Sequence, residues 1–352
     1  MGEVRDTFFY LSKLRQSALG THFSTAADFM RILPNNPLGN FPDNQKFDDV
    51  GRGGREFAGT VCAGTHWELI PLQLPIPLDF DVCGRLAFRG FGGTMSNSTP
   101  ETGVRLYTAG MLPKATSRQL PASDIILVNE GYSFLLGDMI VAALTLSQNG
   151  LDRPLASFDL LNTGYFVNPH GVASLVDTIT DQPCLTGAGT TLTLTDDTGT
   201  HDLYASDDVR DHSFTLANPL IVEPKRTRKG NDPTCGPAGG THQYITKLKH
   251  TGFRTFNGTI NIVFGSTIPY WVLHAKTYVI NNLIIKYKGP LAGATEFFYF
   301  QITVPKCTIR ATPAADLDSD MGYTLNIAAS EDSVTLGGAT LQVQNNITSN
   351  FT

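Results

Sequence analysis

The chain has 352 residues, of which 41% are hydrophobic and 16% are charged; an average soluble protein carries about 25% charged residues. Its formal net charge of −6 excludes nucleic-acid binding through overall charge, so any such contact must come from a local basic patch. No apolar run reaches the about 18 residues that a membrane-spanning helix needs, so we expect no membrane span.

Turn-forming residues are abundant, with 34 glycines and 20 prolines. Together with the low charge they favour an all-β protein that holds much of its surface against something other than water. The five cysteines lie far apart without a C-x-x-C pair, which is typical of buried thiols in a reducing compartment. The N-terminal residues lack an apolar segment, so we expect no secretion signal.

The first 33 residues carry the clearest helical pattern. Apolar residues recur at spacings of four and three, as on one helix face, at Val4, Phe8, Leu11 and Leu14. Ser24 is a suitable N-cap for a second helix over residues 25–33. Residues 34–54 are rich in Pro and Gly and predict an extended connector. We therefore predict an N-terminal arm over residues 1–54, helical and then extended.

Short runs of β-branched and aromatic residues follow from residue 55. They predict strands at 56–62, 66–70, 84–91, 104–108, 125–128 and 139–147. Residues 91–100 read as a loop between two of these strands. Thr190–Thr195 and residues 201–205 flank the turn Asp196–Gly199 and predict a hairpin.

The strongest sheet-forming sequence spans residues 256–304. It contains four runs, at 259–264, 270–273, 278–287 and 297–304. Alternation places Phe298, Phe300, Ile302 and Val304 on one face, and Val279, Leu283, Ile285 and Tyr287 on another. Such a sheet must be covered by a second sheet or another subunit. We predict an all-β, antiparallel β-sandwich with a body over residues 55–310. A C-terminal β segment and tail would span 311–352, and the first strand of its hairpin would be residues 334–336.

Catalytic motifs are missing from the sequence. There is no H-E-x-x-H, G-x-S-x-G or P-loop, and the eight histidines offer no metal-ligand spacing. His66-Trp67-Glu68 matches the H-x-E of zinc deaminases, but Cys184 is not followed by the second cysteine that those enzymes require. We therefore predict that the protein is not an enzyme.

Two acidic clusters are candidate cation sites. Asp316, Asp318 and Asp320 place three carboxylates at alternate positions, and hard cations such as calcium prefer oxygen ligands. The stretch departs from an EF-hand, and a solvated acidic turn is the alternative. Asp79 and Asp81 form the second candidate pair, with the same alternative.

Basic residues gather in one dense run. It consists of Lys225, Arg226, Arg228 and Lys229. Lys247 and Lys249 share one face of a predicted strand and extend the patch. These side chains could neutralise phosphates of a nucleic acid without reading its sequence. The alternative is a solvated loop and a solvated sheet face.

An N-terminal arm, a long all-β body with wide loops, low charge and free cysteines together resemble a viral coat subunit. The chain is similar to the single jelly-roll capsid proteins of small icosahedral positive-strand RNA viruses. Its size and Gly/Thr/Pro-rich loops resemble the coat protein of the alvernaviruses that infect dinoflagellates.

This resemblance implies a major capsid protein, with about 180 copies assembled in the host cytoplasm into a T=3 virion around an RNA genome. It implies an adaptable arm over residues 1–54 and calcium between subunits. It also implies interior RNA contacts by the basic run together with Arg5, Lys13 and Arg15. Outward loops within 92–103 and 150–215 would contact a host-cell receptor.

Two other classes of protein fit the same sequence. A receptor- or carbohydrate-binding β-sandwich, such as a phage tail or fibre protein, would present exposed aromatic platforms. A glycan-active hydrolase would need a pair of carboxylates across a cleft, which the sequence does not locate.

Overall fold

The structure is a computed structural model. It describes residues 8–33, 38–39, 45–47, 65–67, 70–112, 119–129, 132–176, 183, 185–197, 199–205, 209–221, 229–232, 236–237, 242–245, 248–250, 253–263, 277–317, 320–329 and 338–347. The predicted strands at 56–62, 270–273 and 334–336 lie outside these residues. No helix in the described part of the chain is long and apolar enough to cross a membrane.

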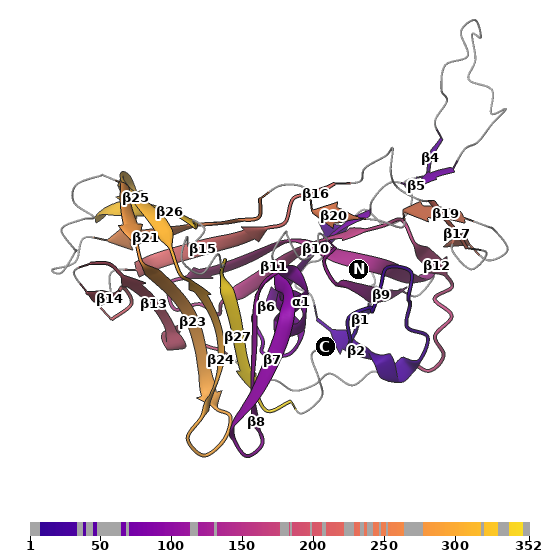
Figure 1. The fold of residues 1–352 in the computed structure, drawn as a ribbon, viewed down its shortest axis with the longest axis horizontal. Helices are drawn as coiled ribbons and strands as arrows, with labels where there is room; N and C mark the ends of the chain where they lie inside the picture. The colour runs from indigo at the N-terminus through magenta and orange to yellow at the C-terminus, as the bar shows by residue number, and fades with distance from the viewer. Residues whose placement is uncertain are drawn as a thin grey trace, which may run out of the picture.

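The larger of two main sheets has 14 strands and is antiparallel along its main path (Figure 1). The path runs β2 (Phe29–Ile32), β1 (Phe8–Ser12), β9 (Ala122–Asn129), β10 (Tyr132–Asn149), β15 (Val209–Ala217), β21 (Thr255–Val263), β26 (Asp320–Ala329), β25 (Cys307–Leu317) and β22 (Thr277–Ile280). Further strands branch from this path: β11 (Leu155–Asn162), β6 (Ile70–Pro77), β3 (Leu38–Gly39), β12 (Phe166–Asn168) and β18 (Gly236–Pro237). β12 and β18 pair in parallel.

The smaller main sheet has seven strands. Its order is β14 (Thr200–Asp202), β13 (Thr190–Thr195), β23 (Asn282–Leu291), β24 (Phe297–Val304), β27 (Thr340–Asn345), β8 (Val104–Met111) and β7 (Gly92–Glu101). Three two-stranded ribbons join β16 (Leu220–Ile221) to β20 (Lys249–His250), β17 (Lys229–Asp232) to β19 (His242–Ile245), and β4 (Gln45–Phe47) to β5 (Thr65–Trp67). The helical elements are α1 (Val82–Phe91) and the 3-10 turns η1 (Ala26–Asp28) and η2 (Gly187–Gly189).

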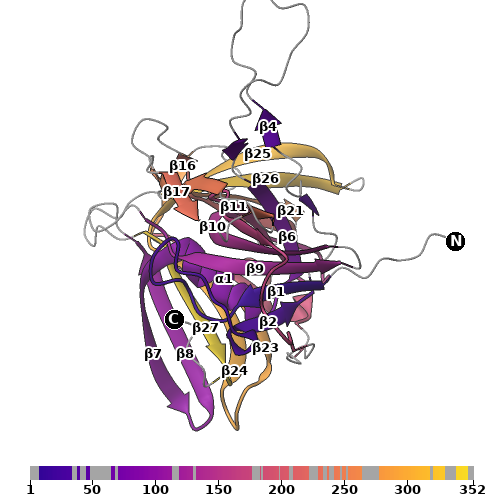
Figure 2. The same ribbon diagram turned by 90° about the vertical axis from the view of Figure 1, so that its right-hand side faces the viewer.

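One hydrophobic core joins the two main sheets, which form two layers in Figure 2. It contains Phe158 and Phe214 from the larger sheet and Ile285 and Phe300 from the smaller one. The predicted all-β, antiparallel sandwich is therefore confirmed. A jelly roll has eight strands in two sheets. The two main sheets here have 14 and seven strands, and the hairpins β23–β24 and β25–β26 each stay within one sheet. The jelly-roll assignment therefore stays a prediction.

Helix α1 lies between the two layers, and all ten of its residues are buried (Figure 2). The carboxylate of Asp79 accepts hydrogen bonds from the backbone N–H groups of Asp81 and Cys83 at its N-terminus. The Arg254 guanidinium donates to the carbonyl oxygens of Gly90 and Phe91 at its C-terminus. An anion at the start and a cation at the end complement the helix dipole. Of the predicted Asp79–Asp81 pair, Asp79 thus caps a helix, and the Asp81 carboxylate accepts from Arg85 Nε at 2.6 Å.

The predicted strand at 84–91 is wrong, because these residues form most of α1. Its sequence alternates apolar with basic residues, as in Leu86, Phe88, Arg85 and Arg89, and so imitates a period of two. Arg85 and Arg89 are also four residues apart, as on one helix face, so this short stretch fits a helical period as well. The predicted loop at 91–100 is also wrong, since Gly92–Glu101 is strand β7.

The predicted helical arm is wrong for the described residues. Phe8–Ser12 forms β1, which pairs with both β2 and β9, and only Ala26–Asp28 is helical. Phe9 and Leu11 enter the main core, while Tyr10 packs on the opposite face in a second cluster. When both faces of a strand are buried, its apolar residues can recur at helical spacings. The spacing alone then does not distinguish the strand from a helix. The boundary predicted at 310 falls inside β25, so the sheets do not follow the predicted division of the chain.

The predicted strand at 278–287 is divided at Asn281. β22 belongs to the larger sheet and β23 to the smaller one, so the chain changes layers there. Ile280 and Leu283 are both buried, three residues apart, and Val279 is exposed instead of sharing a face with Leu283. Strand β24 matches the predicted run 297–304, with Phe298, Phe300, Ile302 and Val304 buried as expected. The predicted hairpin at 190–205 is present as β13 and β14.

A buried histidine links the layers through hydrogen bonds. His212 of β15 has Nε2 2.8 Å from the Tyr287 hydroxyl of β23, and Nδ1 3.0 Å from the Tyr204 hydroxyl. Burial lowers the pKa of His212 to about 4. The folded protein therefore holds the neutral imidazole, whereas the unfolded chain takes up a proton near pH 6.5.

We expect the free energy of unfolding to fall as the pH drops from 6.5 towards 4, by at most about 3 kcal/mol through this group. The contribution is fully present above pH 6.5. His212→Gln should flatten this part of the curve of stability against pH, measured by urea unfolding from pH 4 to pH 8. An unchanged curve in the variant would contradict the assignment.

Candidate functional site

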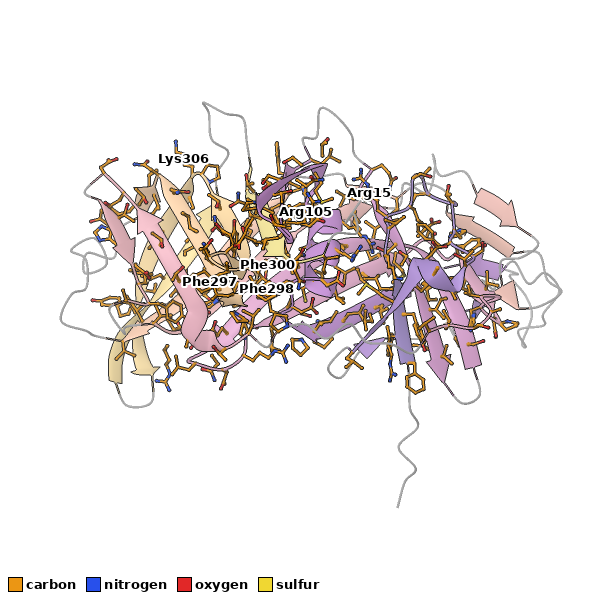
Figure 3. All side chains as sticks on the ribbon, turned by 90° about the horizontal axis from the view of Figure 1, so that it is seen from below. Arg15, Arg105, Phe297, Phe298, Phe300 and Lys306 are labelled. Carbon is orange, nitrogen blue, oxygen red and sulfur yellow. The ribbon has the colours of Figure 1, made fainter. Side chains whose placement is uncertain are left out.

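The predicted basic residues are only partly described. Lys13 and Arg15 follow β1. Lys13 Nζ donates to the Ala27 carbonyl oxygen at 2.7 Å, so this side chain links the end of β1 to η1. Lys229 lies in β17 and Lys249 in β20, in two separate ribbons. The remaining candidates lie outside the described residues: Arg5, Lys225, Arg226, Arg228 and Lys247. In Figure 3, Lys306 is labelled well to the left of Arg15 and Arg105.

The predicted acidic site falls on the hairpin of β25 and β26. Asp316 belongs to β25 and Asp320 to β26, and the ladder ends where Leu317 pairs with Asp320. Asp318 lies outside the described residues. Within the part of the chain that the structure describes, no three His, Cys, Asp or Glu side chains are grouped to hold a metal ion.

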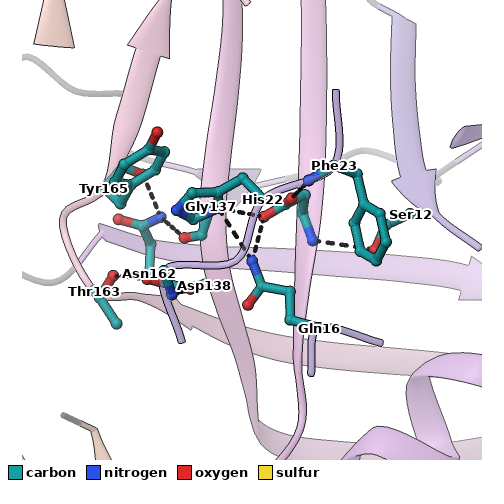
Figure 4. Close-up of polar contacts among 11 residues, drawn as sticks. Ser12, Gln16, His22, Phe23, Gly137, Asp138, Asn162, Thr163 and Tyr165 are labelled. Carbon is teal, nitrogen blue, oxygen red and sulfur yellow. Dashed lines mark hydrogen bonds and ion pairs between the residues drawn. The ribbon is translucent and has the colours of Figure 1, made fainter. Parts of the chain in front are cut away.

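A network of buried polar contacts binds the segment 12–23 to β9 and β10 (Figure 4). Its first anchor is Asp124 of β9, which is fully buried. Asp124 Oδ1 accepts from Gln16 Nε2 at 2.7 Å, and Oδ2 accepts from the backbone N–H of Phe23 at 2.8 Å. The backbone N–H of Asp124 donates to the Ser12 hydroxyl at 3.1 Å. We call this network, together with Asp138 and His22, the clasp.

The second anchor is Asp138, which sits in a bulge of β10. Its backbone has a φ of +56°, and the register of β10 against β9 shifts between Leu136 and Met139. The bulge directs the carboxylate to the backbone N–H of Gly20 at 2.8 Å and the Thr163 hydroxyl at 3.0 Å. Burial raises the pKa of Asp138, while His22 and these donors oppose the rise.

His22 completes the clasp. Its Nδ1 lies 3.1 Å from Asp124 Oδ1, and since an ionised carboxylate only accepts, Nδ1–H is the donor. The ring stacks on Tyr165 with centroids 3.6 Å apart. Gly137 makes this possible, because a Cβ there would lie 2.6 Å from His22 Nδ1 and 2.6 Å from Tyr165 Cδ1.

The chemistry of the clasp is that of an anchor. A His–Asp pair activates a nucleophile when the second ring nitrogen meets a hydroxyl or thiol. His22 Nε2 is buried and has no hydrogen-bond partner among the described residues. The Ser12 hydroxyl is engaged by the backbone of Asp124. The geometry therefore holds the N-terminal segment and aligns no described nucleophile.

A cleft of about 570 Å³ adjoins the clasp. Residues 14–23 form one wall, and residues 119–122 with Gly92 and Leu112 form the other. Apolar residues form most of its lining, and the polar lining residues are Arg15, Gln16, Ser17, Thr21 and Gln119. This volume is in the range of small-molecule pockets.

Sequence reasoning missed the clasp because its partners are about 100 residues apart. Gln16 and Asp124 are 108 positions apart, and Gly20 and Asp138 are 118 apart. One signal was present: Asp124 and Asp138 are acidic residues at the start and in the middle of strongly apolar runs, where an unpaired carboxylate is costly.

No protein-family model matches the chain, and no curated protein shows significant sequence similarity to it. The function is therefore argued from the fold and its surfaces.

Gly137→Ala should lower the free energy of unfolding by about 1 to 3 kcal/mol, because the new methyl group must displace His22 or Tyr165. It should also make the segment 12–23 more susceptible to limited proteolysis. Gly110→Ala is the matched control, since nothing lies within 4 Å of its added Cβ. Equal unfolding midpoints for the two variants in urea would show that the clasp does not need Gly137.

Proposed function

We propose that the protein is a structural subunit that assembles with copies of itself into an icosahedral coat around an RNA genome. The observation that carries the proposal is the end of the larger sheet. Among the described strands β22 is its last, and Val279 of β22 is 52% exposed. An edge strand presents unpaired backbone groups, and an exposed apolar side chain on it favours pairing with another chain.

Exposed apolar side chains elsewhere support the same proposal. Large apolar side chains are exposed at Leu33 after β2, at Leu151 in a turn and at Val176 in an irregular segment. Burial of such groups contributes about 25 cal/mol per Å² of apolar area. Closed symmetry repeats each contact many times, so weak contacts suffice for a stable shell.

The remaining parts of the proposal concern partners. Interior RNA contacts would come from Lys225, Arg226, Arg228, Lys229, Lys247 and Lys249, and calcium between subunits would use Asp316, Asp318 and Asp320. Segments 92–103 and 150–215 would face outward in the virion and contact the host. Both segments supply strands to the seven-stranded sheet: β7 lies at one edge, and β13 next to the other.

Val279→Glu should reduce assembly. A buried carboxylate at an apolar contact costs at least the burial energy of the valine, so half-assembly should need about tenfold more protein. Light scattering after size-exclusion chromatography and negative-stain microscopy would measure this. Leu291→Glu is the matched control, because Leu291 is 51% exposed at the end of β23, in the other main sheet.

A wild-type protein that stays monomeric at high concentration, over a range of salt, pH and calcium, would overturn the coat proposal. Equal assembly of the two variants would show that β22 does not form the contact between subunits. Whether the protein assembles at all would then be decided by the wild-type measurement.

Arg226→Gln combined with Arg228→Gln should weaken binding to single-stranded RNA by a similar factor for every sequence. The slope of log affinity against log salt should fall by about 1 to 1.5, since each lost phosphate contact is worth about 0.7. Fluorescence anisotropy with poly(U) and poly(A) would measure both quantities. Lys306→Gln with Arg310→Gln removes the same charge elsewhere and should leave the slope nearer the wild-type value.

A further inference from the structure

The outward face of the seven-stranded sheet carries a continuous row of polar side chains. Register pairs residues across six neighbouring strands from β13 to β7. The row consists of Thr191, Lys286, Gln301, Gln342, Thr108 and Ser96, all of them partly or fully exposed. With strands about 4.8 Å apart, the row is about 24 Å long.

Much of the hydrogen-bonding capacity of this row is unused within the described chain. Gln301 Nε2 donates to Gln342 Oε1 at 3.0 Å and to the Thr303 hydroxyl at 3.1 Å. This leaves the carbonyl oxygen of Gln301 as an acceptor and the amide N–H groups of Gln342 as donors. Two neighbouring amides, with hydroxyl groups further along the row, suit a ligand rich in hydroxyls.

Positive charge lies beside the row without a bonded counter-ion. Lys286 and Lys288 point to the same face of β23, and neither forms an ion pair with a described residue. Lys286 Nζ lies 4.2 Å from the centre of the Tyr299 ring, and Lys288 Nζ lies 3.5 Å from that of Phe297. The rings therefore hold both ammonium groups in place.

Negative charge is scarce on this face. The five strands between the edge strands β14 and β7 contain no Asp or Glu. The carboxylate of Glu296, whose charge acts on Lys286, accepts from Gln344 Nε2 at 2.8 Å. Burial and the neighbouring Lys288 lower the pKa of Lys286, with Glu296 opposing this. The lysine pair is thus short of negative charge, and an anionic ligand would supply it.

We propose that this face binds an anionic polysaccharide, one that carries sulfate or carboxylate groups along a hydroxyl-rich chain. The lysine pair would contact the anionic groups, and the amide and hydroxyl row would bind the sugar hydroxyls. A single-stranded nucleic acid fits less well, because base stacking needs free ring faces and those of Tyr299 and Phe297 are covered by ammonium groups. A second copy of the chain fits less well because the row lacks the apolar centre of a protein interface.

The experiment measures binding of the full chain to heparin, alginate, neutral dextran and poly(U) by biolayer interferometry at fixed salt. Heparin or alginate should bind, and dextran should not. Lys286→Gln combined with Lys288→Gln should weaken that binding about tenfold or more, since a hydrogen bond to a charged group is worth that much. Gln342→Ala should weaken it by a smaller factor.

Two controls separate the proposal from folding defects and from general electrostatics. Lys286→Arg with Lys288→Arg keeps the charges and the ring contacts, and should keep binding. Lys306→Gln removes one positive charge at the turn after β24, and should change binding less than twofold. The proposal is overturned if heparin and alginate do not bind, if Lys306→Gln weakens binding as much as the double Gln variant, or if poly(U) binds better and depends on the same two lysines.

Discussion

The fold depends on satisfying a guanidinium that has no access to water. Arg89 of α1 is fully buried between the sheets, and burial lowers its pKa to about 9. Its Nη1 donates to the Ser123 hydroxyl at 2.7 Å, and its Nη2 donates to the carbonyl oxygens of Ser12 and Lys13. Arg85, one turn earlier, also donates to Lys13. An unpartnered charge at this depth would be prohibitive, so the N-terminal strand must lie where it does.

The clasp also supplies partners to buried charges, which here are negative carboxylates. Asp124 and Asp138 are carboxylates with no exposed surface, and the segment 12–23 supplies most of their donors. The segment is thus fixed from one side by the arginines of α1 and from the other by these carboxylates. Removing residues 8–32 would take away most partners of both groups of charges and would remove Phe9, Leu11 and Ile32 from the core. The segment therefore belongs to the folded body and is a poor candidate for an arm that changes position.

The parts of the structure that the sequence predicted are those in which one face is buried and the other is not. β24 alternates strictly, so its bounds and its buried face were predicted correctly. In the short elements that are buried on every side, the apolar spacing fitted more than one period, and α1 was predicted as a strand and β1 as a helix. The division of 278–287 at Asn281 depends on the chain changing sheets, which only long-range packing determines. The clasp was missed for the same reason, since its pairs are separated by about 100 residues.

The low charge of the chain has a more specific cause than an apolar surface. Many outward positions of the seven-stranded sheet hold Thr, Gln or Ser, which are polar without being charged, and Lys286 and Lys288 supply positive charge on the same face. Such a surface is solvated as a monomer and also offers many hydrogen bonds to a ligand. Low charge alone therefore favours neither self-association nor ligand binding. Assembly depends on the apolar side chains at strand ends and edges, such as Val279, and recognition depends on the polar face, so separate sets of side chains determine the two properties.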